Sequence, residues 1–365
     1  MKILIPILGF DRAGGNRVLS KLADELIFLG HEVYFLCPNK SDLPYFPSSA
    51  RILWVDRYGK TNSCRVESRR KENAFSIQQK LTRALRSGLA DSFDIIIANQ
   101  SFTTLPIKMA RLLPKTIYYV QAYEPELFNS KSLKNRILHY ISELSYGMKL
   151  FTVVNAEPYR NYKKLKSSRV LYPGVDFTLF YPKKQRISPE YHKIIIGTIG
   201  RTELHKGTRY IIDAFKKISK KYPNAELHIA FGNKEEYKDF SNIYCVQPHG
   251  DKALGDFYRS LDFYICAGYV QLGAFHYPVV EAMSCGVSVI TTEYFPANES
   301  NSWLIKKLQS SGEIIAQFEK ALANQPLQES KIQQALIDVK KFDWKRIGQQ
   351  LNQYIEELKN QLDKN

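Results

Sequence analysis

The 365-residue chain carries 52 Lys and Arg against 36 Asp and Glu, a formal charge of +16, and 44% of its residues are hydrophobic. This length favours two domains, each with a core of its own, and the composition excludes a disordered or collagen-like chain. The charge makes nucleic acid, acidic lipid headgroups and phosphorylated substrates candidate partners. No RRM, KH or zinc-finger pattern supports specific nucleic-acid binding.

The cysteines, histidines and apolar runs exclude further classes. Five scattered cysteines never form a CxxC pair, and seven histidines form no HExxH spacing. These patterns exclude a disulfide framework and a metal site, and they favour a reducing cytosol. The first ten residues, MKILIPILGF, lack the length and flanks of an export signal, and no apolar run approaches the ~18 residues that cross a membrane. We therefore expect a cytoplasmic protein without a metal.

The first half of the chain alternates short apolar strands with helical patterns. KILIPIL (residues 2–8) and EVYFLCP (32–38) predict strands on either side of a helix over 17–30, and FDIIIAN (93–99) and TIYYVQA (116–122) predict further strands. Such alternation predicts a parallel sheet wrapped by helices.

Residues 51–90 are strongly basic. They hold ten Lys or Arg and three acids, so their net charge is 10 − 3 = +7. Such a segment is either a solvated helix face or a docking surface for an anionic membrane, where each cation contributes ~1 kcal/mol. Both interpretations remain open.

A polar, charged stretch at 183–193 predicts a linker, after which the α/β pattern restarts. Two similar halves predict domains over 1–182 and 183–340 that face each other across a cleft. Residues 341–365 predict an amphipathic helix with Trp344, Ile347 and Leu351 on one face, together with Ile355. The repeated pattern gives strands at 192–200, 225–232, 242–250, 263–268 and 287–293, and helices at 208–223, 254–262 and 278–286.

The loop GRTELHKG, residues 200–207, places two cations after a buried strand. Ligands of open α/β sheets gather at the carboxyl ends of such strands. Arg201 and Lys206 would repel each other unless an anion lay between them, and a diphosphate would satisfy both. The alternative is two solvated surface cations.

Two helix starts offer further candidate contacts. Gly14 and Gly15 follow the first strand and let the backbone pass close to a ligand, although a tight turn without function would also use glycines. In FHYPVVEAMSCG, Pro278 can start a helix, leaving the amides of Val279 and Val280 free for phosphate. Glu281 is expected in the first turn, where the helix dipole favours an acidic side chain. The alternative is that its carboxylate accepts hydrogen bonds from a ribose.

Taken together, these motifs resemble the retaining glycosyltransferases of family 4, which have the GT-B fold. The resemblance covers almost the whole chain and depends on the order of five segments. Each is weak alone, but their order is specific. They are GG followed by LADELIFLGHEV, then YPGVDFTLFYP, GRTELHKG, PVVEAMSCGVSVI and FDWKRI.

The resemblance implies a nucleotide-diphosphate sugar as donor and no cofactor besides it. Arg201 and Lys206, in the loop that ends at Gly207, would hold the pyrophosphate, and Glu281 would hold the ribose. The pair Gly14 and Gly15 would approach the donor phosphates from the opposite domain, and the last helix would cross back to the N-terminal domain. Transfer would retain the anomeric configuration and need no metal, because fixed cations and helix N-termini neutralise the leaving group.

Two positions depart from the family pattern. Gly273 stands where the family usually has a second glutamate, so the donor sugar is held differently, as a deoxy sugar such as rhamnose would be, or activity is reduced. His276 is a candidate to compensate. YYVQAYEPELF resembles the VQDYEP form of rhamnosyltransferase-like members, with Ala122 in place of the aspartate. Gln121 and Glu124 are then the candidate catalytic contacts to sugar or acceptor, the alternative for both being helix capping or surface exposure.

The leading hypothesis is a cytoplasmic transferase, peripheral on the membrane, that adds sugar to a glycan or lipid-linked acceptor during cell-surface polysaccharide synthesis. The second is a catalytically weak or inactive GT-B protein that binds a nucleotide sugar or supports a partner enzyme, which Gly273 favours. A nucleotide-sugar epimerase shares the architecture, but the PGVD and GRxxxxKG signatures argue against it.

Overall fold

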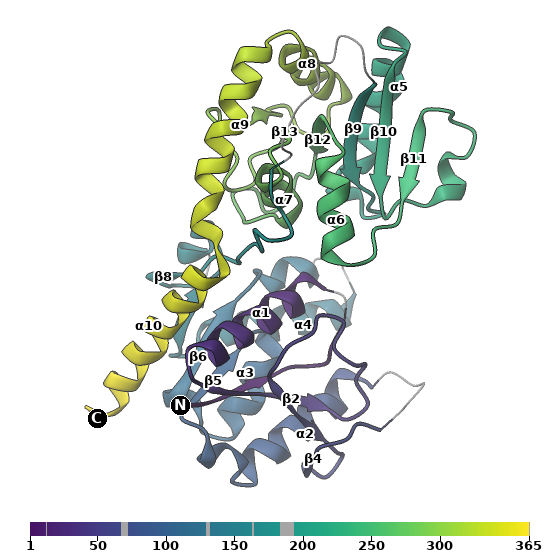
Figure 1. Ribbon diagram of the computed structural model, residues 1–365. Coiled ribbons are helices and arrows are strands. Elements are labelled where there is room, and N and C mark those ends of the chain that lie inside the picture. Colours follow the sequence, from purple (N-terminus) through teal and green to yellow (C-terminus); the bar gives the residue numbers. More distant parts are fainter. Residues whose placement is uncertain (12, 67–71, 129–131, 163, 183–192, 365) are drawn as a thin grey trace. The chain divides into compact units, whose positions relative to one another are not determined.

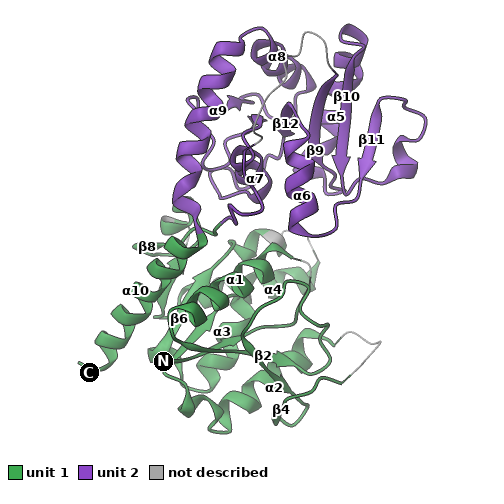
Figure 2. Cartoon of the chain, viewed as in Figure 1, with its two compact units in different colours: residues 1–174, 344–365 green, residues 175–343 purple. Residues whose placement is uncertain are grey.

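The chain folds into two compact units (Figure 2). Unit 1 comprises Met1–Gly174 and Trp344–Asn365, and unit 2 comprises Val175–Asp343. Each unit contains its own sheet with helices packed around it (Figure 1). The computed structural model describes residues 1–11, 13–66, 72–128, 132–162, 164–182 and 193–364.

The unit boundaries differ from the expected ones. The chain leaves unit 1 after Gly174 and returns to it at Trp344, whereas the sequence pattern placed these changes after residues 182 and 340. YPGVDFTLFYP therefore belongs mostly to unit 2. All but Lys193 of the expected linker, 183–193, lies outside the described residues.

Unit 1 is built on an eight-stranded sheet in the order β4-β3-β2-β1-β5-β6-β7-β8. All its strand pairs are parallel except β3 with β4. The strands are β1 (Lys2–Pro6), β2 (Glu32–Pro38), β3 (Arg51–Val55), β4 (Thr61–Asn62), β5 (Ile95–Ala98), β6 (Thr116–Val120), β7 (Phe151–Val154) and β8 (Arg169–Val170). The helices are α1 (Gly14–Phe28), α2 (Ala74–Arg86), α3 (Ser101–Met109), α4 (Leu133–Tyr146) and α10 (Trp344–Leu362).

The last helix, α10, packs on unit 1. A β-carbon added to Gly348 would lie 2.5 Å from Cβ of Glu25 on α1, so the two helices pack closely at this point. His31 Nε2 lies 2.7 Å from Asn352 Oδ1, and the Arg169 guanidinium pairs with Glu357. The predicted apolar face is buried, including Trp344, Ile347, Leu351 and Ile355.

Unit 2 has a six-stranded parallel sheet in the order β11-β10-β9-β12-β13-β14. Counted within the unit this is 3-2-1-4-5-6, the Rossmann order, which reverses direction between β9 and β12. The strands are β9 (Ile194–Ile199), β10 (Ala225–Ala230), β11 (Ile243–Val246), β12 (Phe263–Cys266), β13 (Ser288–Thr291) and β14 (Trp303–Leu304). The helices are α5 (Thr208–Lys221), α6 (Gly250–Arg259), α7 (Tyr277–Ser284), α8 (Ser311–Leu322) and α9 (Gln325–Val339).

Helix α5 shows how the sequence pattern determines the packing of unit 2. Ile211, Phe215 and Ile218 recur at spacings of four and three residues and are all buried in the core beside Ile196 and Leu227 of the sheet. Lysines occupy much of the opposite face. Because β9 and β12 contribute residues to the same core, their carboxyl ends, where the strand order reverses, are held in place.

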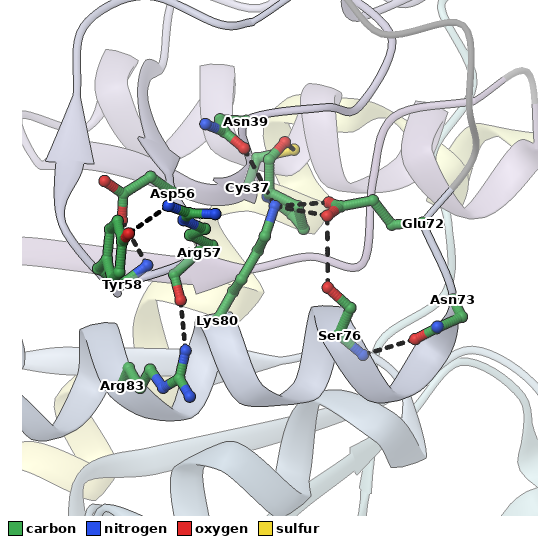
Figure 3. A network of polar contacts seen from close by, with 11 residues as sticks. Cys37, Asn39, Asp56, Arg57, Tyr58, Glu72, Asn73, Ser76, Lys80 and Arg83 are labelled. Atoms are coloured by element: carbon green, nitrogen blue, oxygen red, sulfur yellow. Dashed lines mark hydrogen bonds and ion pairs between the residues drawn. The ribbon is translucent and has the colours of Figure 1, made fainter.

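The basic segment 51–90 does not form one continuous solvated face. Lys80 on α2 is 3% exposed; its ammonium lies 2.6 Å from a carboxylate oxygen of Glu72 and 3.1 Å from Asn39 Oδ1, as Figure 3 shows. Arg83 donates to the carbonyl of Arg57 in the same view. Buried ion pairs with further hydrogen bonds are held within the fold rather than offered to a partner. Residues 67–71, which include three of the cations, lie outside the described part.

Three findings concern membrane, metal and thiols. No helix within the described ranges is both long and apolar enough to cross a bilayer. In the same residues no group of three or more His, Cys, Asp or Glu side chains is arranged to hold a metal ion. The five cysteines are free thiols.

Candidate functional site

The loop after β9 forms a closed turn that carries the two predicted cations. A short 3₁₀ helix, η6 (Leu204–Lys206), lies within it. The N–H of Arg201 donates to Oγ1 of Thr208 at 3.2 Å, and the N–H of Lys206 donates to the carbonyl of Glu203 at 3.0 Å. These bonds tie the start of the loop to the first residue of α5, so Arg201 and Lys206 lie on one short, internally bonded turn.

Gly207 joins this turn to the loop after β12. Its φ is +76°, a left-handed conformation that favours glycine, and a β-carbon there would overlap the carbonyl oxygen of Ala267. The N–H of Tyr269 donates to the carbonyl of His205 at 3.1 Å. The two loops therefore touch at the point where the sheet order reverses, which is the usual ligand position in open α/β sheets.

Charge is concentrated around His276, the residue before α7. Burial, together with the positive charges of Lys206 and Arg201, lowers the pKa of His276 to about 3. Burial also lowers the pKa of Lys206, to which the repulsion of Arg201 adds while Cys266 and Glu203 oppose it. The structure thus brings Arg201, Lys206 and His276 together, and their assignment to donor binding stays a prediction. His276 is a neutral imidazole within that cluster.

Ring packing fixes the orientation of His276. The imidazole stacks on Tyr294 with ring centroids 4.3 Å apart, and its Nδ1 lies 3.9 Å from Sγ of Cys266. Tyr294 in turn donates to the carbonyl of Val270 at 3.1 Å. The loop after β12 and the start of α7 therefore hold the imidazole in one orientation.

Helix α7 starts one residue earlier than predicted, and this changes two expectations. Because Tyr277 is its first residue, Glu281 lies in the second turn and gains little from the helix dipole. The expectation of unpaired amides at Val279 and Val280 is also wrong: both N–H groups donate to the carbonyl of His276, at 3.0 and 3.2 Å. Their assignment to phosphate binding stays a prediction, and it would require shared hydrogen bonds.

Glu281 lies deeper than a surface carboxylate. The residue is 1% exposed, and Tyr258 on α6 donates to its Oε2 at 3.1 Å. The sequence spacing could not reveal this tyrosine, because α6 and α7 are separate elements that meet only in the folded unit. Tyr258 therefore orients the candidate ribose-binding carboxylate.

A pocket lies beside Arg201, at the carboxyl ends of β9 and β10. Its volume is about 370 Å³, within the range of small-molecule sites. Lys206, His276 and Glu281 do not line it. The lining includes Gly200, Arg201, Thr208, Phe231, Gly232 and Tyr237. Arg201 thus belongs both to the lining of this pocket and to the charged cluster around His276.

In unit 1 the predicted glycines lie at the start of α1. A β-carbon on Gly14 would meet nothing within 4 Å, whereas one on Gly15 would lie 3.4 Å from the amide of Gln121. Asn155 holds the backbone of Gln121 through a 2.7 Å hydrogen bond to its carbonyl. The structure therefore brings Gly15 and Gln121 together and leaves open space beside Gly14.

Glu124 is directed toward the first residue of α3. Its Oε1 accepts from the N–H of Ser101 at 2.9 Å, and Oε2 accepts from the Ser101 hydroxyl. Burial raises the pKa of Glu124, while these hydrogen bonds partly oppose the shift. The carboxylate therefore caps α3, the alternative left open for it, and its catalytic role stays a prediction.

A tyrosine that the sequence analysis missed supports this segment. Tyr146 on α4 accepts from the N–H of Glu124 and donates to the carbonyl of Ala122, both at 3.2 Å. Its ring stacks on those of Tyr118 and Tyr123. Tyr146 therefore holds the segment around Tyr123 through both ring stacking and hydrogen bonds, which no local sequence pattern predicts.

The class of protein follows from the two units together. Each has a mainly parallel, Rossmann-like sheet, and each collects its candidate site residues at the carboxyl ends of central strands. This is the two-domain GT-B fold, as the sequence predicts.

One family model matches within unit 2. Residues 193–324 match the family model described as glycosyl transferases group 1. Mannosylfructose-phosphate synthase of Agrobacterium fabrum is 26% identical over 153 residues. That match spans 35% of this chain and 33% of the relative, so only about a third of the relative's length is covered.

Solved structures share the fold over nearly the whole chain. Sucrose-phosphate synthase from Thermosynechococcus elongatus superposes with a TM-score of 0.77 at 16% identity, covering 98% of this chain and 99% of that one. Anabaena Alr3699/HepE in complex with UDP and glucose gives a TM-score of 0.71 at 15% identity, covering 98% and 100%. These similarities confirm the fold.

Proposed function

We propose that the chain is a retaining glycosyltransferase that moves a sugar from a nucleotide-diphosphate donor to a glycan or lipid-linked acceptor in cell-surface polysaccharide synthesis. One observation carries the proposal: Arg201 and Lys206 lie on one turn, at the strand-order reversal of unit 2, close enough to His276 to lower its pKa. Such a concentration of positive charge is stabilised by an anion. A pyrophosphate supplies the required charge and oxygen atoms.

The proposed chemistry depends on stabilising the leaving group. As the glycosidic bond to the donor breaks, negative charge develops on the departing diphosphate, and fixed cations lower the barrier by binding that charge. Arg201 offers a planar fork of donors for two phosphate oxygens, and Lys206 offers a compact charge for another. Departing phosphate accepts the acceptor's proton, so the protein supplies positioning rather than a strong base. No metal is needed in this scheme.

Other contacts follow from the geometry of unit 2. Glu281, oriented by Tyr258, is the proposed partner of the ribose hydroxyls, and small side-chain movements must open its carboxylate to them because the residue is 1% exposed. Neutral His276 is the proposed hydrogen-bonding partner of the donor sugar. In this proposal the imidazole replaces the family's glutamate carboxylate, which is missing because Gly273 has no side chain. A single neutral partner suits a deoxy sugar, because such a sugar has fewer hydroxyl groups to bind.

The second candidate is a catalytically weak or inactive protein that binds the nucleotide sugar. Gly273 favours it. The φ of Gly273 is +80°, a left-handed backbone conformation that a glutamate could adopt only under strain, so this loop does not suit the carboxylate that the family usually has there. The binding residues of unit 2 would be the same. A nucleotide-sugar epimerase is a further use of this architecture, since fold alone does not determine chemistry.

Product analysis distinguishes these functions. The purified protein is incubated with UDP-, GDP- and dTDP-sugars, with and without acceptors, and nucleoside diphosphate release is measured together with ¹³C NMR of the anomeric carbon. A transferase releases diphosphate only when donor and acceptor are both present, and it forms a new glycosidic bond of retained configuration. Donor binding by calorimetry without a new bond under any acceptor supports the binding protein instead. Conversion of the donor sugar without an acceptor supports the epimerase.

A further inference from the structure

Helix α4 presents an apolar stripe to solvent. Leu133, Ile137, Tyr140 and Leu144 are 72%, 51%, 59% and 44% exposed. Their spacing of four, three and four residues places them within an arc of about 60°, at about 100° per residue. Amphipathic helices normally direct such a stripe into the core. In α4 it points outward instead.

The opposite face of α4 fixes the helix in this orientation. Ser142, Ser145 and Tyr146 are buried, and Tyr146 bonds to the backbone of Ala122 and Glu124. His139 Nδ1 lies 2.9 Å from the carbonyl oxygen of Pro125. The stripe cannot turn inward without breaking these contacts, so it stays available to a partner.

Positive charge borders the stripe on both sides. Lys134 and Arg136 are exposed, lie on opposite sides of the stripe by helical position, and form no ion pair with another described residue. The one acid of the helix, Glu143, is paired with Lys164 at 3.3 Å. The exposed surface is therefore apolar along its centre and cationic along its margins.

We propose that this stripe docks on the surface of an anionic lipid bilayer. Interfacial helices bury apolar side chains at the headgroup boundary while lysine and arginine remain at the level of the phosphates. Each cation adds ~1 kcal/mol at an anionic membrane. A second copy of the chain fits this surface poorly, because the molecule carries +16 and the margins of both stripes would repel.

The docking surface differs from the basic segment that the sequence suggested. Helix α2 buries Leu81, Ala84 and Leu85, and its Lys80 is held in the internal network of Figure 3. Neither the apolar side chains nor that ammonium is available to lipid. Among the described helices of unit 1, α4 combines the exposed apolar row with unpaired cations.

Docking through α4 selects the class of acceptor. The inner face of α4 contacts residues 122–125, which include the candidate catalytic residue Glu124 and directly follow Gln121, so a docked helix holds this segment at the membrane surface. A lipid-linked acceptor, rather than a free glycan, reaches such a position. This choice of acceptor rests on the proposed function, whereas the docking itself does not.

Vesicle flotation of the full chain tests the proposal. Wild type is expected to float with phosphatidylcholine vesicles containing about one third phosphatidylglycerol, and much less with pure phosphatidylcholine. The double variant L133S/I137S is expected to lower the partition coefficient by about tenfold or more. The matched control L327S/I337S alters two exposed apolar residues on α9 of unit 2 and should bind like wild type.

A fluorescence readout tests insertion directly. The native tryptophans, Trp54, Trp303 and Trp344, are all buried, so their emission should not respond to vesicles. In I137W the added indole lies at the centre of the stripe. Its emission is expected to shift to the blue on vesicle binding and to be quenched by brominated lipid.

Three results would overturn the proposal. One is wild-type partitioning of L133S/I137S. Another is loss of vesicle binding in the double variant Lys60→Gln/Arg86→Gln, which removes two exposed cations of the basic segment, while L133S/I137S still binds vesicles. The third is a dimer in light scattering that L133S/I137S dissociates while vesicle binding is unchanged. A protein that floats as expected but transfers no sugar would overturn the proposed function alone.

Discussion

Gly207 and Ala267 touch through their backbones, because a β-carbon on Gly207 would overlap the Ala267 carbonyl oxygen. This contact joins the cationic turn after β9 to the loop after β12. It fixes the distance between Lys206, which precedes Gly207, and Cys266, which precedes Ala267. The candidate site therefore depends on the absence of one side chain.

Substituting Gly207 with alanine should destabilise unit 2. Left-handed φ costs an alanine about 1–2 kcal/mol, and the overlap adds about 1–3 kcal/mol, so we expect a loss of roughly 2–5 kcal/mol. Urea unfolding followed by tryptophan emission measures it, since Trp303 reports on unit 2. Gly250→Ala is the matched control: its φ is +80° but its β-carbon would meet nothing within 4 Å, so only the conformational cost applies. Equal losses in both variants would contradict a steric contact at Ala267.

Removing either cation should weaken donor binding without unfolding the protein. We expect Arg201→Ala and Lys206→Ala each to lower the affinity for a nucleoside diphosphate by about 1.5–3 kcal/mol, the range for charged hydrogen bonds. Calorimetry measures the affinity. Lys217→Ala, an exposed cation on α5, is the control for net charge and should bind normally. Unchanged affinity in both site variants would remove the pyrophosphate assignment.

Gly14→Ala separates a binding role from a structural one. The added methyl group meets no other atom within 4 Å, and replacing glycine at a compatible position stabilises a protein by about 0.4–1 kcal/mol. If the backbone there passes close to a substrate, the same methyl group should reduce transfer while the melting temperature is kept or raised. Normal kcat and KM in this variant would show that no substrate group approaches Gly14.

His276 should contribute a pH-dependent share of stability. Above pH 6.5 its imidazole is neutral in both folded and unfolded states. Below pH 6.5 the unfolded state binds a proton, while the folded state does not until about pH 3. The unfolding free energy therefore falls as the pH falls through this window, by at most about 1.4 kcal/mol per pH unit from this residue.

Comparing variants isolates that share. Unfolding by urea between pH 4 and 7 should show a weaker decline for His276→Gln than for wild type. His249→Gln replaces an exposed histidine and should keep the wild-type decline. Parallel curves for His276→Gln and wild type would mean that the imidazole takes up its proton freely in the folded chain.

Local patterns predicted much of the fold. Buried strands such as β9 and β12 are short apolar runs, and the face of α10 recurs at helical spacing, so both are encoded within a few residues. The strand β3 and the helix α2 were not predicted. Both lie in the basic segment, where charged residues obscured the hydrophobic periodicity. Unit boundaries were displaced because the chain crosses between units inside YPGVDFTLFYP, where no composition change marks the crossing.

The site was predicted less completely than the fold, since contacts between distant elements decide it. GRTELHKG identified the turn with Arg201 and Lys206, but the sequence could not show that Gly207 meets Ala267. Neither could it place Tyr258 on Glu281 or turn Glu124 toward Ser101, because these pairs are 23 residues apart in the chain. The start of α7 shifted by one residue, which was enough to change the predicted state of two amides.

The two chain crossings between the units lie side by side. The N–H of Val175 donates to the carbonyl of Phe342 at 2.7 Å, and a β-carbon on Gly174 would overlap the ring of Trp344. Unit 2 is therefore an insertion into unit 1, and its two ends lie next to each other. Residues 175–343 therefore begin and end at neighbouring points, and a short linker from Gly174 to Trp344 could close unit 1 without unit 2.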